Sequence, residues 1–172
     1  IDLRSKGGMS HGKLHWSANF DEVQDFEIQI RDLNSGAGLM SDADYAATQH
    51  PLNDPPKTGR SADLDALAAY VGSLSEPTKS PFTNSGLLTP EAIEGKVVFE
   101  ALACNNCHSG AFFTDSPADE VHDIGTIKAT SGNHLGGPLT ALDAPTLRGL
   151  WLTAPYLHDG SAKTIEAAVL AH

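Results

Sequence analysis

The sequence predicts an all-α protein whose helices are joined by long irregular loops. Residues 61–75 and 89–104 each place apolar side chains at helical spacing behind a residue that commonly caps a helix N-terminus. The segments between and after them are rich in Gly, Pro, Ser and Thr. No run of alternating residues typical of a β-strand occurs along the chain. We therefore expect helices to supply all of the regular structure.

The first half of the chain predicts two helices and two loops. Residues 20–33 mix apolar and acidic side chains in the manner of an amphipathic helix. Residues 34–60 carry several Pro and Gly residues, which favour a loop. Ser61 is a good N-cap for a helix over 61–75. The following segment, 76–88, has the Pro and Gly content of a linker.

The second half predicts two more helices around a long loop. Thr89 is a good N-cap, and Pro90 suits the first helical position, so a helix should start there and run to Cys104 on its apolar stripe. Residues 109–144 show no sustained period, which favours a chain wrapped around a cofactor. A last helix is expected from Thr164 to the end of the sequence.

Charge and length exclude several classes of partner. The 172 residues carry a net charge of -11, which disfavours nucleic acid and anionic membranes as partners. No apolar run is long enough to span a bilayer. A partner protein should present a basic docking patch, because complementary charge speeds encounter. The sequence opens on Ile1 without a leader, so we expect a mature fragment or an excised domain.

Both cysteines lie in one short motif, Cys104-Asn105-Asn106-Cys107-His108. Two thiols at this spacing can each bond one vinyl group of a haem, and the His that follows can bind its iron. The motif therefore predicts one covalent haem c with His108 on the iron. A thioredoxin-like redox pair is one alternative, but it needs a βαβ setting. A zinc site is the other, and it would have to recruit two histidines such as His122 and His134.

Covalent haem also predicts a location. Thioether formation requires an export-linked, oxidising compartment in which the thiols stay reduced until they react. We expect the protein in the periplasm or outside the cell.

The second half contains six ordered motifs, at residues 95–99, 104–110, 113–115, 122–126, 145–150 and 154–161. Together they resemble the C-terminal haem domain of bacterial di-haem cytochrome c peroxidases. That family is all-α, and it includes peroxidases, enzymes that form tryptophylquinone, and domains that only carry electrons. The resemblance implies a haem-binding cytochrome domain over 87–172, and 1–86 as an N-terminal helical part, a possible haem-less remnant of a first cytochrome domain. The peroxidases use two haems, whereas this chain has one attachment motif.

The resemblance also implies the second iron ligand, which family members take from the helix after the Pro-Tyr-x-His-Asp-Gly segment. The matching position is His172, so we expect iron held by His108 and His172, with a terminal residue of no function as the alternative. Met40 and Met9 are the other candidates, and no motif supports them.

Two further residues complete the candidate site. Arg148 could pair with a haem propionate, since a guanidinium offers forked donors to a carboxylate, or it could form a surface ion pair. Tyr156 lies in a motif expected beside the haem, with core packing as its alternative role.

These residues predict a carrier of single electrons that serves a partner protein, such as a secreted copper oxidoreductase. The alternative is a mono-haem peroxidase, which needs an open iron position and a nearby acid-base group.

Overall fold

The computed structural model describes residues 12–32, 35–50, 52, 55–74 and 79–172. Five α-helices, four short 3-10 turns and six two-residue strands lie within them. The helices are α1 (Phe26–Asp32), α2 (Asp42–Ala47), α3 (Ala62–Ser73), α4 (Pro90–Ala101) and α5 (Ile165–Val169). The strands are β1 (Thr83–Asn84), β2 (Leu87–Leu88), β3 (Val121–His122), β4 (Asn133–His134), β5 (Gly137–Pro138) and β6 (Leu142–Asp143). The 3-10 turns are η2 (Val23–Asp25), η3 (Cys104–Asn106), η4 (Ser116–Ala118) and η5 (Leu150–Leu152).

The expectation of an all-α fold is wrong. The described residues contain three antiparallel pairs, β1 with β2, β3 with β6, and β4 with β5, joined by long loops. A strand of two residues is too short to show the alternation by which strands are recognised in a sequence. The β1–β2 hairpin depends on its turn instead, where Ser85 and Gly86 take φ values of 51° and 83°.

Side-chain caps start three helices where the sequence predicts. The hydroxyls of Ser61, Thr89 and Thr164 accept hydrogen bonds from backbone N–H groups in the first turns of α3, α4 and α5. The expected run of α4 to Cys104 is wrong, because the helix ends at Ala101 and Ala103 turns left-handed at a φ of 58°. In the described part of the chain, no helix is long and apolar enough to cross a membrane.

The segments 20–33 and 34–60 differ more from the structure predicted from the sequence. The helix predicted over 20–33 begins with a 3-10 turn and becomes α-helical at Phe26. The loop predicted over 34–60 contains α2, which starts because the Ser41 hydroxyl accepts from the N–H of Asp44 at 3.1 Å.

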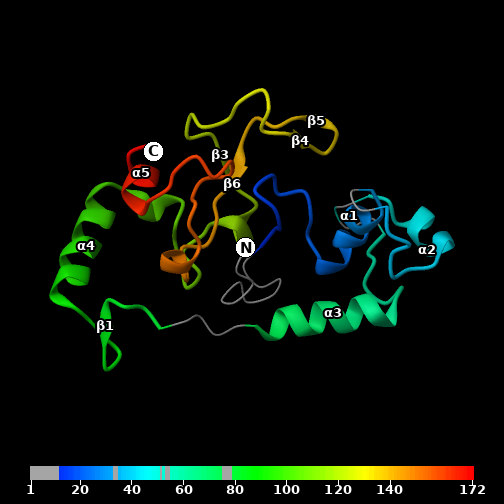
Figure 1. Cartoon of the computed structure of the whole chain (residues 1–172), viewed down its shortest axis with the longest axis horizontal. Helices are drawn as coiled ribbons and strands as arrows, with labels where there is room; N and C mark the ends of the chain where they lie inside the picture. Colours follow the sequence, from blue (N-terminus) through cyan, green and yellow to red (C-terminus); the bar gives the residue numbers. More distant parts are fainter. Residues whose placement is uncertain (1–11, 33–34, 51, 53–54, 75–78) are drawn as a thin grey trace.

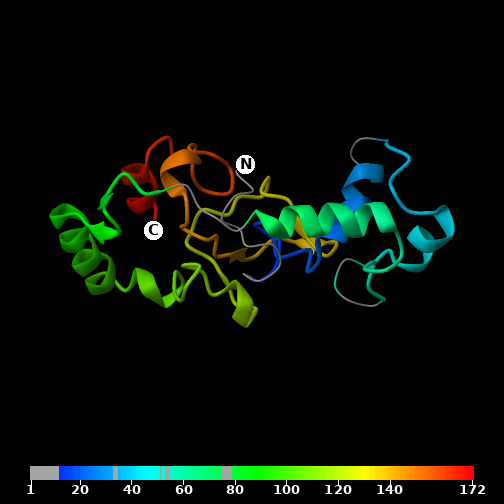
Figure 2. The same cartoon turned by 90° about the horizontal axis from the view of Figure 1, so that it is seen from below.

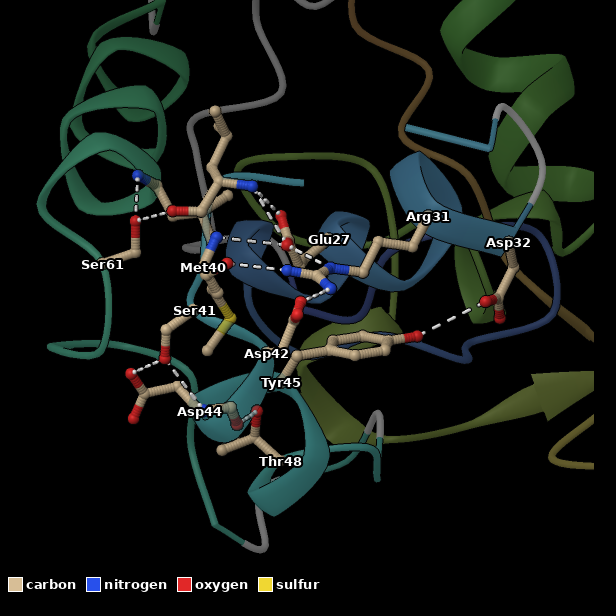
Figure 3. Close-up of polar contacts among 12 residues, drawn as sticks. Glu27, Arg31, Asp32, Met40, Ser41, Asp42, Asp44, Tyr45, Thr48 and Ser61 are labelled. Carbon is tan, nitrogen blue, oxygen red and sulfur yellow. Dashed lines mark hydrogen bonds and ion pairs between the residues drawn. The ribbon is translucent and has the colours of Figure 1, made fainter. Parts of the chain in front are cut away.

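A buried carboxylate organises the residues around α1 and α2 (Figure 3). Glu27 has no exposed side-chain surface, and it accepts hydrogen bonds from Arg31 Nε at 2.8 Å and from the backbone N–H groups of Leu39 and Met40. Burial alone would raise the pKa of Glu27, but these bonds lower it below its ordinary value. Arg31 in turn lies 4.4 Å from the centre of the Tyr45 ring. Polar contacts therefore form much of the core here.

A second buried ion pair ties the loop before α3 to η2. Lys57 Nζ lies 2.7 Å from Asp25 Oδ1, and both side chains are 1% exposed. The same ammonium donates to the carbonyl of His50 at 3.1 Å. Because water does not reach either charge, removing one partner would leave the other charge buried and uncompensated.

The helices gather at the two ends of the molecule. Both views place α1, α2 and α3 toward one end and α4 and α5 toward the other (Figures 1 and 2). Residues 13–17, near the start of the described chain, lie between the two groups of helices and form hydrogen bonds and an ion pair with residues in the second half of the chain. Their contacts are Lys13 with Asp119, the carbonyl of Trp16 with the N–H of Asp143, and the carbonyl of Ser17 with His134 Nδ1. The division into 1–86 and 87–172 stays a prediction, and these contacts cross it.

Replacing Lys57 with Met should destabilise the fold by about 3–5 kcal/mol, because the Asp25 charge would stay buried without a partner. Urea unfolding of the Lys57→Met variant measures this. Lys96→Met is the matched control, since the Lys96–Glu100 pair is exposed and should contribute only about 0–1 kcal/mol. Equal losses in the two variants would contradict the role given to the buried pair.

Candidate functional site

The cysteine motif folds into one tight turn after α4. Cys104 opens the turn η3, and the N–H of His108 donates to the carbonyl of Cys104 at 3.0 Å. Both cysteines are free thiols and half-buried. The turn therefore brings the two thiols and the His108 imidazole to one short stretch of backbone at the end of α4.

His172, which follows α5, lies against His108. The centres of the two rings are 6.5 Å apart, and the ring planes are inclined by 55°. The Nδ1 of His108 lies 3.2 Å from the carbonyl of Phe113, and the Nδ1 of His172 lies 2.8 Å from the carbonyl of Ala168. Neither Nε2 has a hydrogen-bond partner among the described residues. Each imidazole is thus fixed through one nitrogen and has the other available.

Burial keeps His108 in the form that binds metals. Desolvation lowers the pKa of His108 below its ordinary value, although the carbonyls of Phe113 and Pro145 act in the opposite direction. A neutral imidazole with Nδ1–H bonded to a carbonyl presents the lone pair of Nε2, as metal-binding histidines do.

The spacing of the two rings and the surface beside them fit a haem. A metal–imidazole bond is about 2 Å long, so two rings on opposite sides of one iron have their centres about 6 Å apart. The helices beside the rings expose apolar side chains that a flat apolar cofactor could cover. On α4 and the residue after it these are Val97 at 63%, Val98 at 56% and Leu102 at 64% exposed, and near the end of α5 they are Val169 at 56% and Leu170 at 80%.

The two alternatives for the cysteines find less support. Cys107, Asp115 and His122 offer ligand atoms that lie within 4.8 Å of one another, with His122 Nε2 2.6 Å from Asp115. Cys104 does not belong to this group, and His134 bonds to the backbone instead. The described residues thus do not assemble the four zinc ligands considered from the sequence. They also lack the βαβ setting of a redox pair, since their strands form only short antiparallel pairs.

The remaining candidates occupy different places. Arg148 stacks on the ring of Phe112, with Cζ 5.3 Å from the ring centre. The hydroxyl of Tyr156 donates a hydrogen bond to the carbonyl of Leu150 at 3.1 Å. Met40 is buried beside Glu27, next to α2, at the end of the molecule away from α5 (Figures 1 and 3). Met9 lies outside the described residues.

Polar contacts connect the loop over residues 126–131 to the motif at residues 154–161, which precedes α5. The Nε2 of His158 lies 2.8 Å from the Ser131 hydroxyl, and Lys128 Nζ lies 2.6 Å from Asp159. The Lys128 ammonium and the Ser161 hydroxyl and N–H hold the pKa of Asp159 well below its usual range. These contacts hold the segment that leads to His172.

One buried carboxyl, on the β3–β6 pair, was not singled out in the sequence. Asp143 in β6 is 7% exposed. Burial raises its pKa to about 7, the carboxylates of Asp115 and Asp119 act in the same direction, and Lys13 opposes them. The sequence carries no signal for this, because it depends on the β3–β6 pairing.

Comparison with known proteins finds similarity over part of the chain. The model of a family described as RoxA-like, cytochrome c-like matches residues 141–171. The cytochrome c551 peroxidase of Nitrosomonas europaea is 31% identical over 129 residues, which cover 62% of this chain and 36% of the relative. The methylamine utilization protein MauG of Methylorubrum extorquens is 41% identical over 123 residues, which cover 62% of this chain and 33% of the relative. The chain thus spans about a third of the length of these two relatives.

One solved structure is also similar. It is a hydrazine synthase of Kuenenia stuttgartiensis, with a TM-score of 0.49 and 29% identity over 60% of this chain and 44% of the other.

The Asp143 carboxyl should make stability depend on pH. Between about pH 4 and 7 the folded protein holds a proton on Asp143 that the unfolded chain has released, so the free energy of unfolding should fall as pH rises. In Asp143→Asn this fall should become shallower. Urea midpoints from pH 4 to 8 measure it, with Asp123→Asn, an exposed carboxyl, as control. Identical pH profiles for Asp143→Asn and the wild type would contradict the raised pKa.

Proposed function

We propose that this chain carries single electrons through one covalently bound haem c, which is supported by its partial similarity to a cytochrome c551 peroxidase and to a RoxA-like, cytochrome c-like family. Cys104 and Cys107 would form the two thioether bonds to the haem, and His108 and His172 would hold its iron. When bound, the haem supplies an iron that takes up and releases one electron. Arg148 pairs with a propionate, and Tyr156 packs beside the cofactor.

The pair of imidazoles is the observation that supports this proposal best. The rings of His108 and His172 stand 6.5 Å apart, each held through Nδ1 with Nε2 available. Two histidines from different segments would both bind the iron, so it would keep no open position for a substrate. A closed haem of this kind suits electron transfer better than chemistry at the iron.

The second candidate is a mono-haem peroxidase, which the similarity to a cytochrome c551 peroxidase favours. It would need an iron position that His172 vacates and a nearby acid-base group. The helix end that carries His172 is exposed, so its release would disturb little else. The two functions therefore differ in whether His172 stays on the iron.

The partner is an oxidoreductase with a basic docking patch, such as a secreted copper enzyme. A carrier with a net charge of -11 attracts such a surface and repels an acidic one. The location is the periplasm or the outside of the cell, because thioether formation takes place in an export-linked compartment.

Replacing His172 with Ala should open the iron. The oxidised wild type should be low-spin and keep its haem in acid acetone, whereas His172→Ala should gain a high-spin component. Cyanide affinity should rise by about tenfold or more, which is about 1.4 kcal/mol. Absorbance and electron paramagnetic resonance spectra measure both effects. Met40→Leu, a volume-conserving change, is the control. An unchanged spectrum in His172→Ala, or a change in Met40→Leu, would remove His172 from the iron.

Electron exchange and peroxide turnover separate the two functions. A carrier should be reduced quickly by a basic redox protein, and the rate should fall by about tenfold or more as salt shortens the Debye length from about 30 Å at 0.01 M to about 10 Å at 0.1 M. Stopped-flow reduction at several ionic strengths measures this, beside a steady-state peroxidase assay. Rapid peroxide turnover by the intact protein, with reduction rates indifferent to salt, would favour the peroxidase.

A further inference from the structure

Two buried threonines join the segments on either side of His108. The Thr114 hydroxyl donates to the carbonyl of Ala144, and the Thr146 hydroxyl donates to the carbonyl of Phe112. The side chains are almost fully enclosed, with 5% and 6% of the residues exposed. The two bonds are reciprocal, because each segment, 112–114 and 144–146, gives one hydroxyl and one carbonyl.

The direction of both hydrogen bonds is fixed locally. The Thr114 hydroxyl accepts from the N–H of Ser116 at 3.1 Å, and the Thr146 hydroxyl accepts from the N–H of Arg148 at 3.2 Å. A hydroxyl has a single proton. Each threonine oxygen accepts from an N–H of its own segment and donates its proton to a carbonyl of the other segment. A side chain of the same shape without the hydroxyl could not make this link.

The carbonyl of the middle residue in each segment influences the His108 imidazole. Phe113 lies between Phe112 and Thr114, and its carbonyl is 3.2 Å from His108 Nδ1. Pro145 lies between Ala144 and Thr146, and its carbonyl acts to raise the pKa of His108, against the effect of burial. The N–H of Thr114 donates to the carbonyl of Ser109 at 2.9 Å, which closes the turn after His108.

From this geometry we propose that Thr114 and Thr146 are positioning residues that hold the segment 112–114, and with it the Phe113 carbonyl, against His108 Nδ1 and thereby set the reduction potential of the haem. The proposal rests on the proposed function, which puts His108 on the iron. A carbonyl that accepts from Nδ1–H makes the imidazole a stronger electron donor through Nε2. A stronger donor favours oxidised iron and lowers the potential.

The test compares Thr→Val with Thr→Ser at both positions in the haem-loaded chain. Valine keeps the shape and removes the hydroxyl, so Thr114→Val and Thr146→Val should each shift the equilibrium toward reduced iron. We expect about tenfold with both together, which is a rise of about 59 mV for one electron. Thr114→Ser and Thr146→Ser keep the hydroxyl and should keep the wild-type potential.

Thr48→Val is the matched control. Thr48 is fully buried, and its hydroxyl donates to the carbonyl of Asp44 at 2.8 Å, but it lies beside α2 and away from His108. This variant should lose stability and leave the potential unchanged. Potentiometric titration gives the potentials, and proton exchange at His108 Nδ1, followed by NMR of the reduced protein, should quicken in the valine variants at positions 114 and 146.

The outcomes separate this inference from the proposed function. Low-spin haem with an unchanged potential in both valine variants would overturn the positioning role alone. If those variants fail to retain haem, proton exchange at His108 Nδ1 in the wild-type protein still tests the positioning role. Exchange as fast as that of an exposed imidazole would overturn the role. A wild-type protein without low-spin haem would overturn the proposed function and this inference with it.

Discussion

The helices α4 and α5 expose apolar side chains to water, and the stability of the site depends on a group that covers them. Among the described residues from 87 onward, the buried apolar side chains are few, whereas those of α4 and α5 are largely exposed. Burial contributes about 25 cal/mol for each Å² of apolar surface removed from water, so a group that covers these helices would stabilise them directly. A haem anchored in the turn after α4 is such a group. The buried apolar residues are Leu139, Leu142, Ala144 and Ala162.

The first half is stabilised differently. Its core includes the Glu27 carboxylate and the Lys57–Asp25 pair, and each of these charges has a partner within hydrogen-bond distance. Such networks specify a geometry, because a partly satisfied network is costly. They also explain why Met40 is an unsuitable iron ligand, since its backbone is held inside the network.

The sequence predicts those parts of the fold that local chemistry determines. Capping residues such as Ser61 and Thr89 start helices through contacts within four residues, and the cysteine motif is itself local. The strand pairs escaped prediction because turns and distant partners determine them. Thr114 and Thr146 lie in two of the motifs found in the sequence, but their hydrogen bonds could not be predicted because they join residues about thirty positions apart. His172 was suggested by a family resemblance, and its place beside His108 follows from the fold.

The contacts of the early segment have a consequence for how the protein is assembled. Lys13, Ser17 and Asn19 bond to residues 106, 117 and 114 positions further along the chain. Closing loops of this length costs conformational entropy, and topologies with such distant contacts fold slowly. During synthesis the early segment must wait for its partners, which emerge long after it. The strands β4 and β6 are therefore completed by residues made first, so a shortened chain that starts after α3 would leave backbone groups such as the Asp143 N–H without their bonds.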